Sequence, residues 1–152
     1  MKPMLATFRR EHVEMLSELY ALDQALAQCA EGWVKRERVR QVVQQLQALI
    51  RERLLPHCVR EKRALRPLLR RGSHGSWLTA LLEDDRLLRR EERLLQHLLH
   101  ALEQENEPAL GQVIAAGERI IAALIEHIHQ EEIRLFPILE SLGAGEGKGL
   151  HA

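Results

Sequence analysis

The sequence has little cysteine and no excess of charge of either sign. Cys29 and Cys58 form neither a CxxC motif nor the pattern of a disulfide framework. The chain carries 22 Lys and Arg residues and 22 Asp and Glu residues, so its formal net charge is zero. A chain without a net positive charge has no global attraction for nucleic acid, and we expect no nucleic-acid partner.

Long apolar runs are also missing. No stretch approaches the ~20 apolar residues that a helix needs to span a bilayer, so we expect no membrane partner. The first ten residues lack the apolar core of a signal peptide, and we therefore expect a cytoplasmic protein. A length of 152 residues, 45% of them hydrophobic, is enough for one domain with a proper core.

Four segments carry apolar residues with the period of an amphipathic helix. We predict helices over about residues 4–29, 34–69, 76–104 and 106–142. The breaks between them contain Gly32, Gly72 and Pro108, residues that are typical of helix ends and helix starts. The pattern predicts an all-α fold, an up-down-up-down antiparallel four-helix bundle over residues 1–142. The glycine-rich residues 143–152 should form a flexible tail.

A tetrad of residues on the second predicted helix recurs on the fourth. The two copies read His57-x₃-Glu61-x₃-Leu65-x-Pro67 and His127-x₃-Glu131-x₃-Leu135-x-Pro137. Residues at i and i+4 share one helix face, with Cβ atoms about 5–6 Å apart. Each copy therefore places an imidazole beside a carboxylate, and two such pairs that face each other would form a metal site.

Two more polar residues lie on the apolar stripes at the same height. In antiparallel neighbours, residues at one height are symmetric about the connecting loop. His12 is symmetric with His57 about the first break, and Asp84 is symmetric with Glu61 and with His127 about the next two. The predicted layer of metal ligands therefore comprises His12, His57, Glu61, Asp84, His127 and Glu131.

A pair of divalent metal ions would offset the free-energy cost of burying the charged side chains of this layer. An uncompensated buried charge costs several kcal/mol, and carboxylate with imidazole suits iron, manganese or zinc. The alternative is a set of buried ion pairs, such as His57 with Glu61. The duplicated motif, with His12 and Asp84 at the same height, favours metal over ion pairs. A ferritin-type site needs two Glu-x-x-His motifs, and only Glu126-x-x-His129 is present.

These residues resemble the hemerythrin-like, or HHE cation-binding, family over roughly residues 8–140. The matching pieces are Glu11-His12, His57-x₃-Glu61 and His127-x₃-Glu131-Glu132-x₃-Phe136-Pro137. The resemblance implies a four-helix bundle that holds a non-haem di-iron centre. It implies two iron ions with a bridging oxo or hydroxo group, the two glutamates as bridges and the histidines as terminal ligands. Manganese and zinc are the alternative metals.

Family members bind dioxygen, sense oxygen, nitric oxide or iron, or repair damaged iron-sulfur centres. The resemblance therefore implies a small ligand such as dioxygen, nitric oxide or peroxide. We expect a binding or sensing protein rather than an enzyme, as a monomer or a homodimer. A di-iron oxidase or peroxidase is one alternative, and an iron-handling or iron-sulfur repair protein is another.

The third predicted helix departs from the family pattern. The family has a Glu-His pair where this chain reads Glu83-Asp84, and Ala80 and Leu88 occupy the positions one turn away. Replacing an imidazole by a carboxylate lowers the charge of the ligand set by one unit, which stabilises the higher oxidation state. Asp84 therefore predicts a centre that oxidises readily, suited to sensing, peroxide chemistry or iron handling rather than to oxygen transport.

Pro56 interrupts the second predicted helix directly before His57. A proline inside a helix removes one backbone hydrogen bond and usually kinks the helix. The bend either aims His57 or is merely tolerated, and the sequence leaves both interpretations open.

Overall fold

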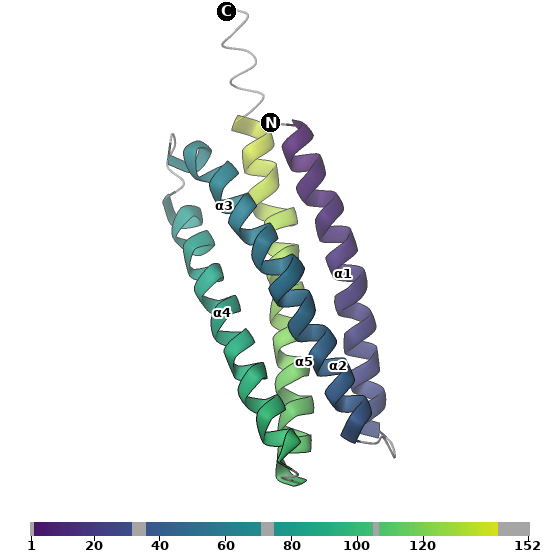
Figure 1. The fold of residues 1–152 in the computed structure, drawn as a ribbon. Helices are drawn as coiled ribbons and strands as arrows, with labels where there is room; N and C mark the ends of the chain where they lie inside the picture. Colours follow the sequence, from purple (N-terminus) through teal and green to yellow (C-terminus); the bar gives the residue numbers. More distant parts are fainter. Residues whose placement is uncertain (1, 32–35, 71–74, 105–106, 143–152) are drawn as a thin grey trace, which may run out of the picture.

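A computed structural model describes residues 2–31, 36–70, 75–104 and 107–142 of the chain. These ranges form four long helical rods and contain no strand (Figure 1). The first and third rods are single helices, α1 (Lys2–Glu31) and α4 (Gly75–Glu103). The second rod consists of α2 (Arg36–Leu49), a π-helical turn η1 (Ile50–Leu54) and α3 (Leu55–Arg70). The fourth consists of α5 (Glu107–Gln130), a second π-helical turn η2 (Glu131–Leu135) and a last helical stretch over residues 136–142.

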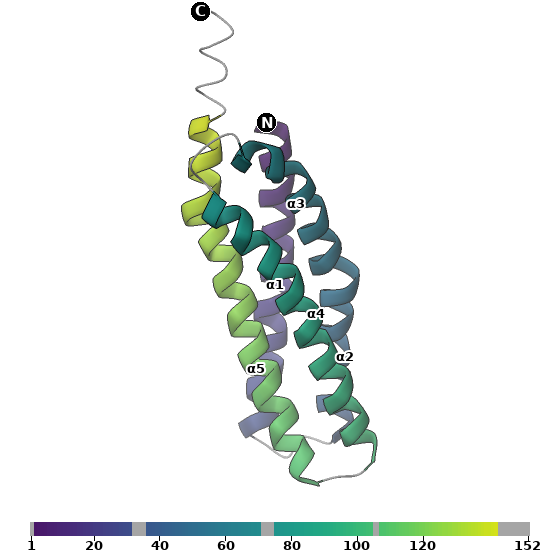
Figure 2. The same cartoon turned by 90° about the vertical axis from the view of Figure 1, so that its left-hand side faces the viewer.

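The rods pack as a closed antiparallel bundle. Helix α1 contacts α2 and α5, and α4 contacts α3 and α5, so each rod touches the next one along the chain and the last touches the first. Figure 2 shows the same arrangement turned by 90°, with the start of α1 and the end of the fourth rod at the same end of the bundle. The predicted all-α four-helix bundle is confirmed.

Each rod forms because its apolar residues return to one face. In α1 the buried positions recur at spacings of three and four residues, which keeps them on one side of a helix. They are Leu5, Phe8, His12, Met15, Leu19, Leu22, Leu26 and Cys29. The predicted helix boundaries lie within a few residues of the observed ones. The predicted tail at 143–152 and most of the predicted breaks lie outside the described residues, so the domain boundary stays a prediction.

Two prolines follow the π-helical turns. The Leu55 N–H bonds to the Ile50 carbonyl, and the Phe136 N–H bonds to the Glu131 carbonyl, each five residues back. Pro56 and Pro137 come directly after these bonds. A proline ring clashes with the carbonyl four residues before it, and here that carbonyl lies inside the wider turn. The irregularity expected at Pro56 is therefore a π-helical turn that precedes the proline.

The core is divided into two apolar clusters by a polar layer. The larger cluster includes Met15, Cys58 and Ile128, and the smaller one includes Phe8, Leu65 and Leu135. On three rods, buried polar residues lie between the residues of the two clusters. They are His12, His57, Glu61 and Glu131, the most deeply buried titratable side chains among the described residues. The candidate site is this layer.

Candidate metal centre

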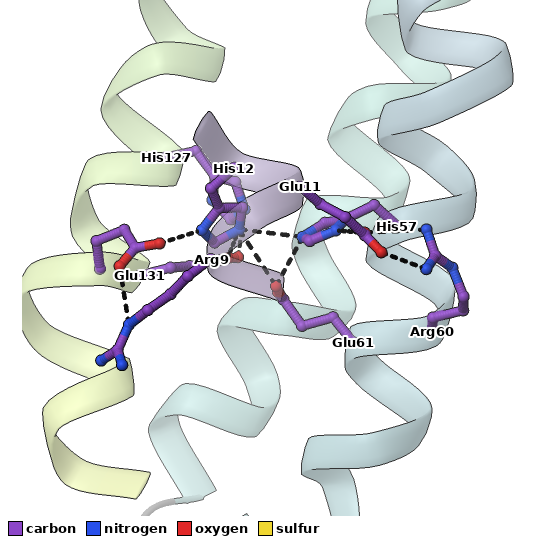
Figure 3. Close-up of polar contacts among 9 residues, drawn as sticks. Arg9, Glu11, His12, His57, Arg60, Glu61, His127 and Glu131 are labelled. Atoms are coloured by element: carbon purple, nitrogen blue, oxygen red, sulfur yellow. Dashed lines mark hydrogen bonds and ion pairs between the residues drawn. The ribbon is translucent and has the colours of Figure 1, made fainter. Parts of the chain in front are cut away.

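Four side chains from three rods meet in the polar layer. His12 comes from α1, His57 and Glu61 come from α3, and Glu131 is the first residue of η2 (Figure 3). One ligand atom of each lies within 4.8 Å of those of the other three. The four residues are only 1–3% exposed. We call this group the four-residue cluster.

The separations within the cluster are those of ligands around a common centre. His12 Nε2 lies 3.0 Å from His57 Nε2, 3.1 Å from Glu131 Oε2 and 3.5 Å from Glu61 Oε2. His57 Nε2 lies 2.8 Å from Glu61 Oε2. Ligand atoms held about 2.0–2.2 Å from one ion are roughly 3.0–3.5 Å from one another. Hydrogen bonds span similar distances, so the decisive feature lies in the remaining carboxylate oxygens.

Glu61 and Glu131 each keep a second oxygen, Oε1, buried without a hydrogen-bond partner among the described residues. Glu131 Oε1 lies 2.6 Å from His127 Nε2, but the two atoms do not have hydrogen-bond geometry. A buried acceptor without a donor costs about 1–3 kcal/mol. A cation on the Oε1 side of the carboxylates would remove that cost at Glu61, whereas Glu131 Oε1 already faces the His127 imidazole.

His127 lies on the outer side of the layer. It occupies the last turn of α5, one turn before Glu131, and its side chain is 25% exposed. Its position matches the predicted i, i+4 pairing with Glu131, although it is not one of the four residues that converge within 4.8 Å. The layer thus has a fully buried half with two histidines and an outer half with one.

Asp84, the sixth predicted ligand, belongs to α4. Its side chain lies outside the described part of the structure, so its role stays a prediction from the sequence. The structure therefore brings together four of the six predicted residues, His12, His57, Glu61 and Glu131, and places His127 against Glu131.

Two further carboxylates contact the imidazoles from outside the cluster. Glu132 Oε1 lies 2.7 Å from His12 Nδ1, and Glu11 Oε2 lies 2.5 Å from His57 Nδ1. Sequence reasoning gave neither residue a role. In the sequence they stand out only as neighbours of predicted ligands, because Glu11 precedes His12 and Glu132 follows Glu131 in the pieces that resemble the hemerythrin-like family.

Aromatic rings fix the planes of the two buried imidazoles. The Phe136 ring stacks on His12, with centroids 5.3 Å apart and planes 10° apart. The Phe8 ring meets His57 edge-on, with centroids 5.5 Å apart. Both phenylalanines belong to the smaller apolar cluster, which therefore closes one side of the layer.

Without a metal, the excess negative charge of the layer is balanced by protons. Burial lowers the pKa of His12, but the bonds to Glu131 and Glu61 outweigh it and raise that pKa to about 10. Burial also opposes protonation of His57, yet its contacts with Glu61 and Glu11 raise the pKa of His57 above its ordinary value. At neutral pH His12 therefore holds a proton that a cation would have to displace.

The two buried carboxylates differ in the direction of their shifts. Burial, reinforced by the neighbouring Glu131 carboxylate, raises the pKa of Glu61. Burial would also raise the pKa of Glu131, but His12 and His127 lower it below its usual range. Like charges in one apolar site cannot both ionise freely, so one carboxylate keeps its proton more readily than the other.

Comparison of the chain with known protein families agrees with this geometry. Residues 3–139 match the family model described as the hemerythrin HHE cation binding domain. The chain therefore belongs to this family, which makes metal binding its class of function. No curated protein and no solved structure matches the chain.

Among the described residues, no helix combines the length and the hydropathy that crossing a bilayer requires. The cytoplasmic location stays a prediction from the sequence.

Proposed function

We propose that this chain is a small metal-binding protein with a non-haem di-iron centre in its bundle core, and that it binds or senses dioxygen, nitric oxide or iron. The observation that carries the proposal is the pair of buried carboxylates. Glu61 directs Oε2 at both histidines of the four-residue cluster, Glu131 directs Oε2 at His12, and both keep Oε1 buried without a hydrogen-bond partner among the described residues. Carboxylates placed in this way could each be shared by two cations.

The first metal position is defined by His12 and His57. Their Nε2 atoms face each other at 3.0 Å, while both Nδ1 atoms face outer carboxylates. An ionised carboxylate accepts hydrogen bonds only, so with a cation on the Nε2 side the hydrogens of both rings would lie on Nδ1, against Glu132 and Glu11. Both Nε2 lone pairs would then be available to the cation.

The second metal position lies on the Oε1 side of the carboxylates. His127 would supply a nitrogen ligand there, since its Nε2 is 2.6 Å from Glu131 Oε1. Asp84 would supply the remaining protein ligand, as its position in the sequence pattern predicts. The two positions together use all six predicted residues, three histidines and three carboxylates.

The donor set favours iron, with manganese and zinc as alternatives. Imidazole suits iron and zinc, and carboxylate suits manganese and other hard cations. Bound iron supplies a change of oxidation state and an open coordination position, which is the chemistry that recognition of a diatomic gas needs. The chain itself excludes water from the inner side of the layer through the two apolar clusters, with Phe8 beside His57.

Anaerobic reconstitution with Fe²⁺ tests the proposal. We expect two iron ions per chain and an optical spectrum that changes when oxygen or nitric oxide is admitted. A protein that retains no iron after desalting would contradict the proposal and would leave the polar layer as a network of buried ion pairs. Sustained consumption of oxygen or hydrogen peroxide in the presence of a reductant would instead assign an oxidase or peroxidase.

A further inference from the structure

The outer carboxylates, Glu11 and Glu132, contact the two buried histidines in the same way. Each faces the Nδ1 atom of one ring, at 2.5 Å for His57 and 2.7 Å for His12. In both rings the opposite nitrogen, Nε2, faces the four-residue cluster. The same orientation of the ring is therefore built twice, from different helices.

An arginine holds the first of these carboxylates in place. Arg60 donates to Glu11 from both terminal nitrogens, at 2.5 Å to Oε1 and 3.0 Å to Oε2 (Figure 3). Such a bidentate pair fixes the carboxylate plane as well as its position. Arg60 therefore fixes the face of the Glu11 carboxylate that meets His57.

A second arginine holds the other carboxylate. Arg9 Nε lies 3.4 Å from Glu132 Oε2, and Arg9 also binds Glu140 at 2.5 Å. Its guanidinium lies 5.5 Å from the centroid of Phe136, the ring that stacks on His12. The second chain of contacts therefore runs from Arg9 through Glu132 to His12.

We propose that Glu11 and Glu132 are positioning residues that hold His57 and His12 in the tautomer and orientation of metal ligands. The inference rests on the proposed function. A carboxylate on the far nitrogen of a ligating histidine fixes which nitrogen carries the hydrogen and makes the other a better donor to the metal. Both links also cross between helices, because Glu11 of α1 reaches α3 and Glu132 of η2 reaches α1. The ligand geometry is thus set by the packing of the bundle.

Alanine and glutamine variants of the outer carboxylates, titrated with Co²⁺, test this role. We expect Glu11→Ala and Glu132→Ala each to weaken Co²⁺ binding by about 10–100-fold and to alter the visible spectrum of the Co²⁺-loaded protein. Glu11→Gln and Glu132→Gln should fall between these variants and the wild type. An amide oxygen still accepts from Nδ1–H, but without the charge that strengthens the imidazole as a ligand.

The matched control is Glu14→Ala. Glu14 is another glutamate of α1 that pairs with an arginine, Arg53, but it touches neither histidine in the described contacts. Its removal should leave Co²⁺ affinity and spectrum unchanged. The melting temperature of each metal-free variant separates a loss of packing from a loss of ligand orientation.

Two results would overturn the inference in distinguishable ways. Wild-type affinity and spectrum in both alanine variants, with only a lower melting temperature, would make the outer carboxylates ordinary helix-to-helix ion pairs. If the alanine variants do not fold, wild-type behaviour of both glutamine variants carries the same meaning. A wild-type protein that binds no Co²⁺ would overturn the proposed function and this inference together.

Discussion

The two halves of the polar layer are built differently. On the inner side, His12 and His57 are 1% and 2% exposed, and both are backed by carboxylates and by phenylalanine rings. On the outer side, His127 is 25% exposed. Glu61 and Glu131 both turn Oε2 to His12, and Glu131 Oε1 faces His127. For the proposed metal centre, the difference between the halves predicts a rigid inner position and a more accessible outer one.

A ligand that serves both halves should matter most. We expect Glu131→Ala to weaken iron binding by more than about 100-fold at both positions, since even outer partners of metal ligands are worth 10–100-fold. Metal content after desalting, measured by elemental analysis, gives the result. Glu126→Ala is the control, because Glu126 is exposed and bonds only to Gln130 among the described contacts. Retention of two tightly held metals in Glu131→Ala would show that Glu131 is no bridge.

Removing one histidine from each half tests whether the inner and outer halves bind metal differently. We expect His127→Ala to keep one tightly bound metal per chain, because the inner position retains both of its histidines. His57→Ala should lose the tighter of the two binding events and leave His12 without its facing nitrogen. Isothermal titration of the metal-free variants measures both stoichiometry and affinity. Identical losses in the two variants would show that the halves are equivalent.

The inner half also predicts an unusual dependence on pH. The pKa of His12 is about 10 in the metal-free fold and 6.5 ordinarily, so folding favours its protonated form. This stabilisation is complete below about pH 6.5 and is lost as the pH rises toward 10, a loss on the order of a few kcal/mol. Chemical denaturation of the metal-free protein between pH 6.5 and 10 should therefore show falling stability.

Metal loading should remove this dependence, because a metal replaces the protons of the histidines. Metal affinity should rise over the same pH window. A metal-free protein whose stability is flat from pH 6.5 to 10 would show that His12 is not protonated in the fold.

The smallest expected effect concerns the charge of the outer half. Asp84→His removes one negative charge from the predicted ligand set, which should make the higher oxidation state less favourable. Reductive titration of the iron-loaded proteins should give a higher reduction potential in the variant than in the wild type. An equal or lower potential would exclude Asp84 from the ligand set.

The fold was predictable because its signal is local and repeated. Apolar spacing within each rod sets the buried face. The symmetry of antiparallel neighbours about their loop predicts from the sequence that His12 and His57 lie at one level of the bundle. The same symmetry links Glu61 to His127 through Asp84, and the i, i+4 spacing adds Glu131. The structure brings His12, His57, Glu61 and Glu131 together.

The remaining features depend on packing across helices. Glu11 and Glu132 acquire their partners only when α1 lies against α3 and η2, and no spacing along one helix encodes those contacts. An apolar pattern of constant helical period does not reveal the π-helical turns. Pro56 predicts an irregularity, but its consequence lies in the preceding residues, Ile50–Leu54.

The most direct measurement is the melting temperature of the protein before and after exhaustive anaerobic chelation. A metal present at about 100 times its Kd stabilises the fold by about 2.7 kcal/mol, which for a chain of this length corresponds to roughly 5–10 °C. We predict that chelation lowers the melting temperature by at least this amount and that added Fe²⁺ restores it. An unchanged melting temperature, with no metal detected in the untreated protein, would contradict the claim that cations hold this layer together.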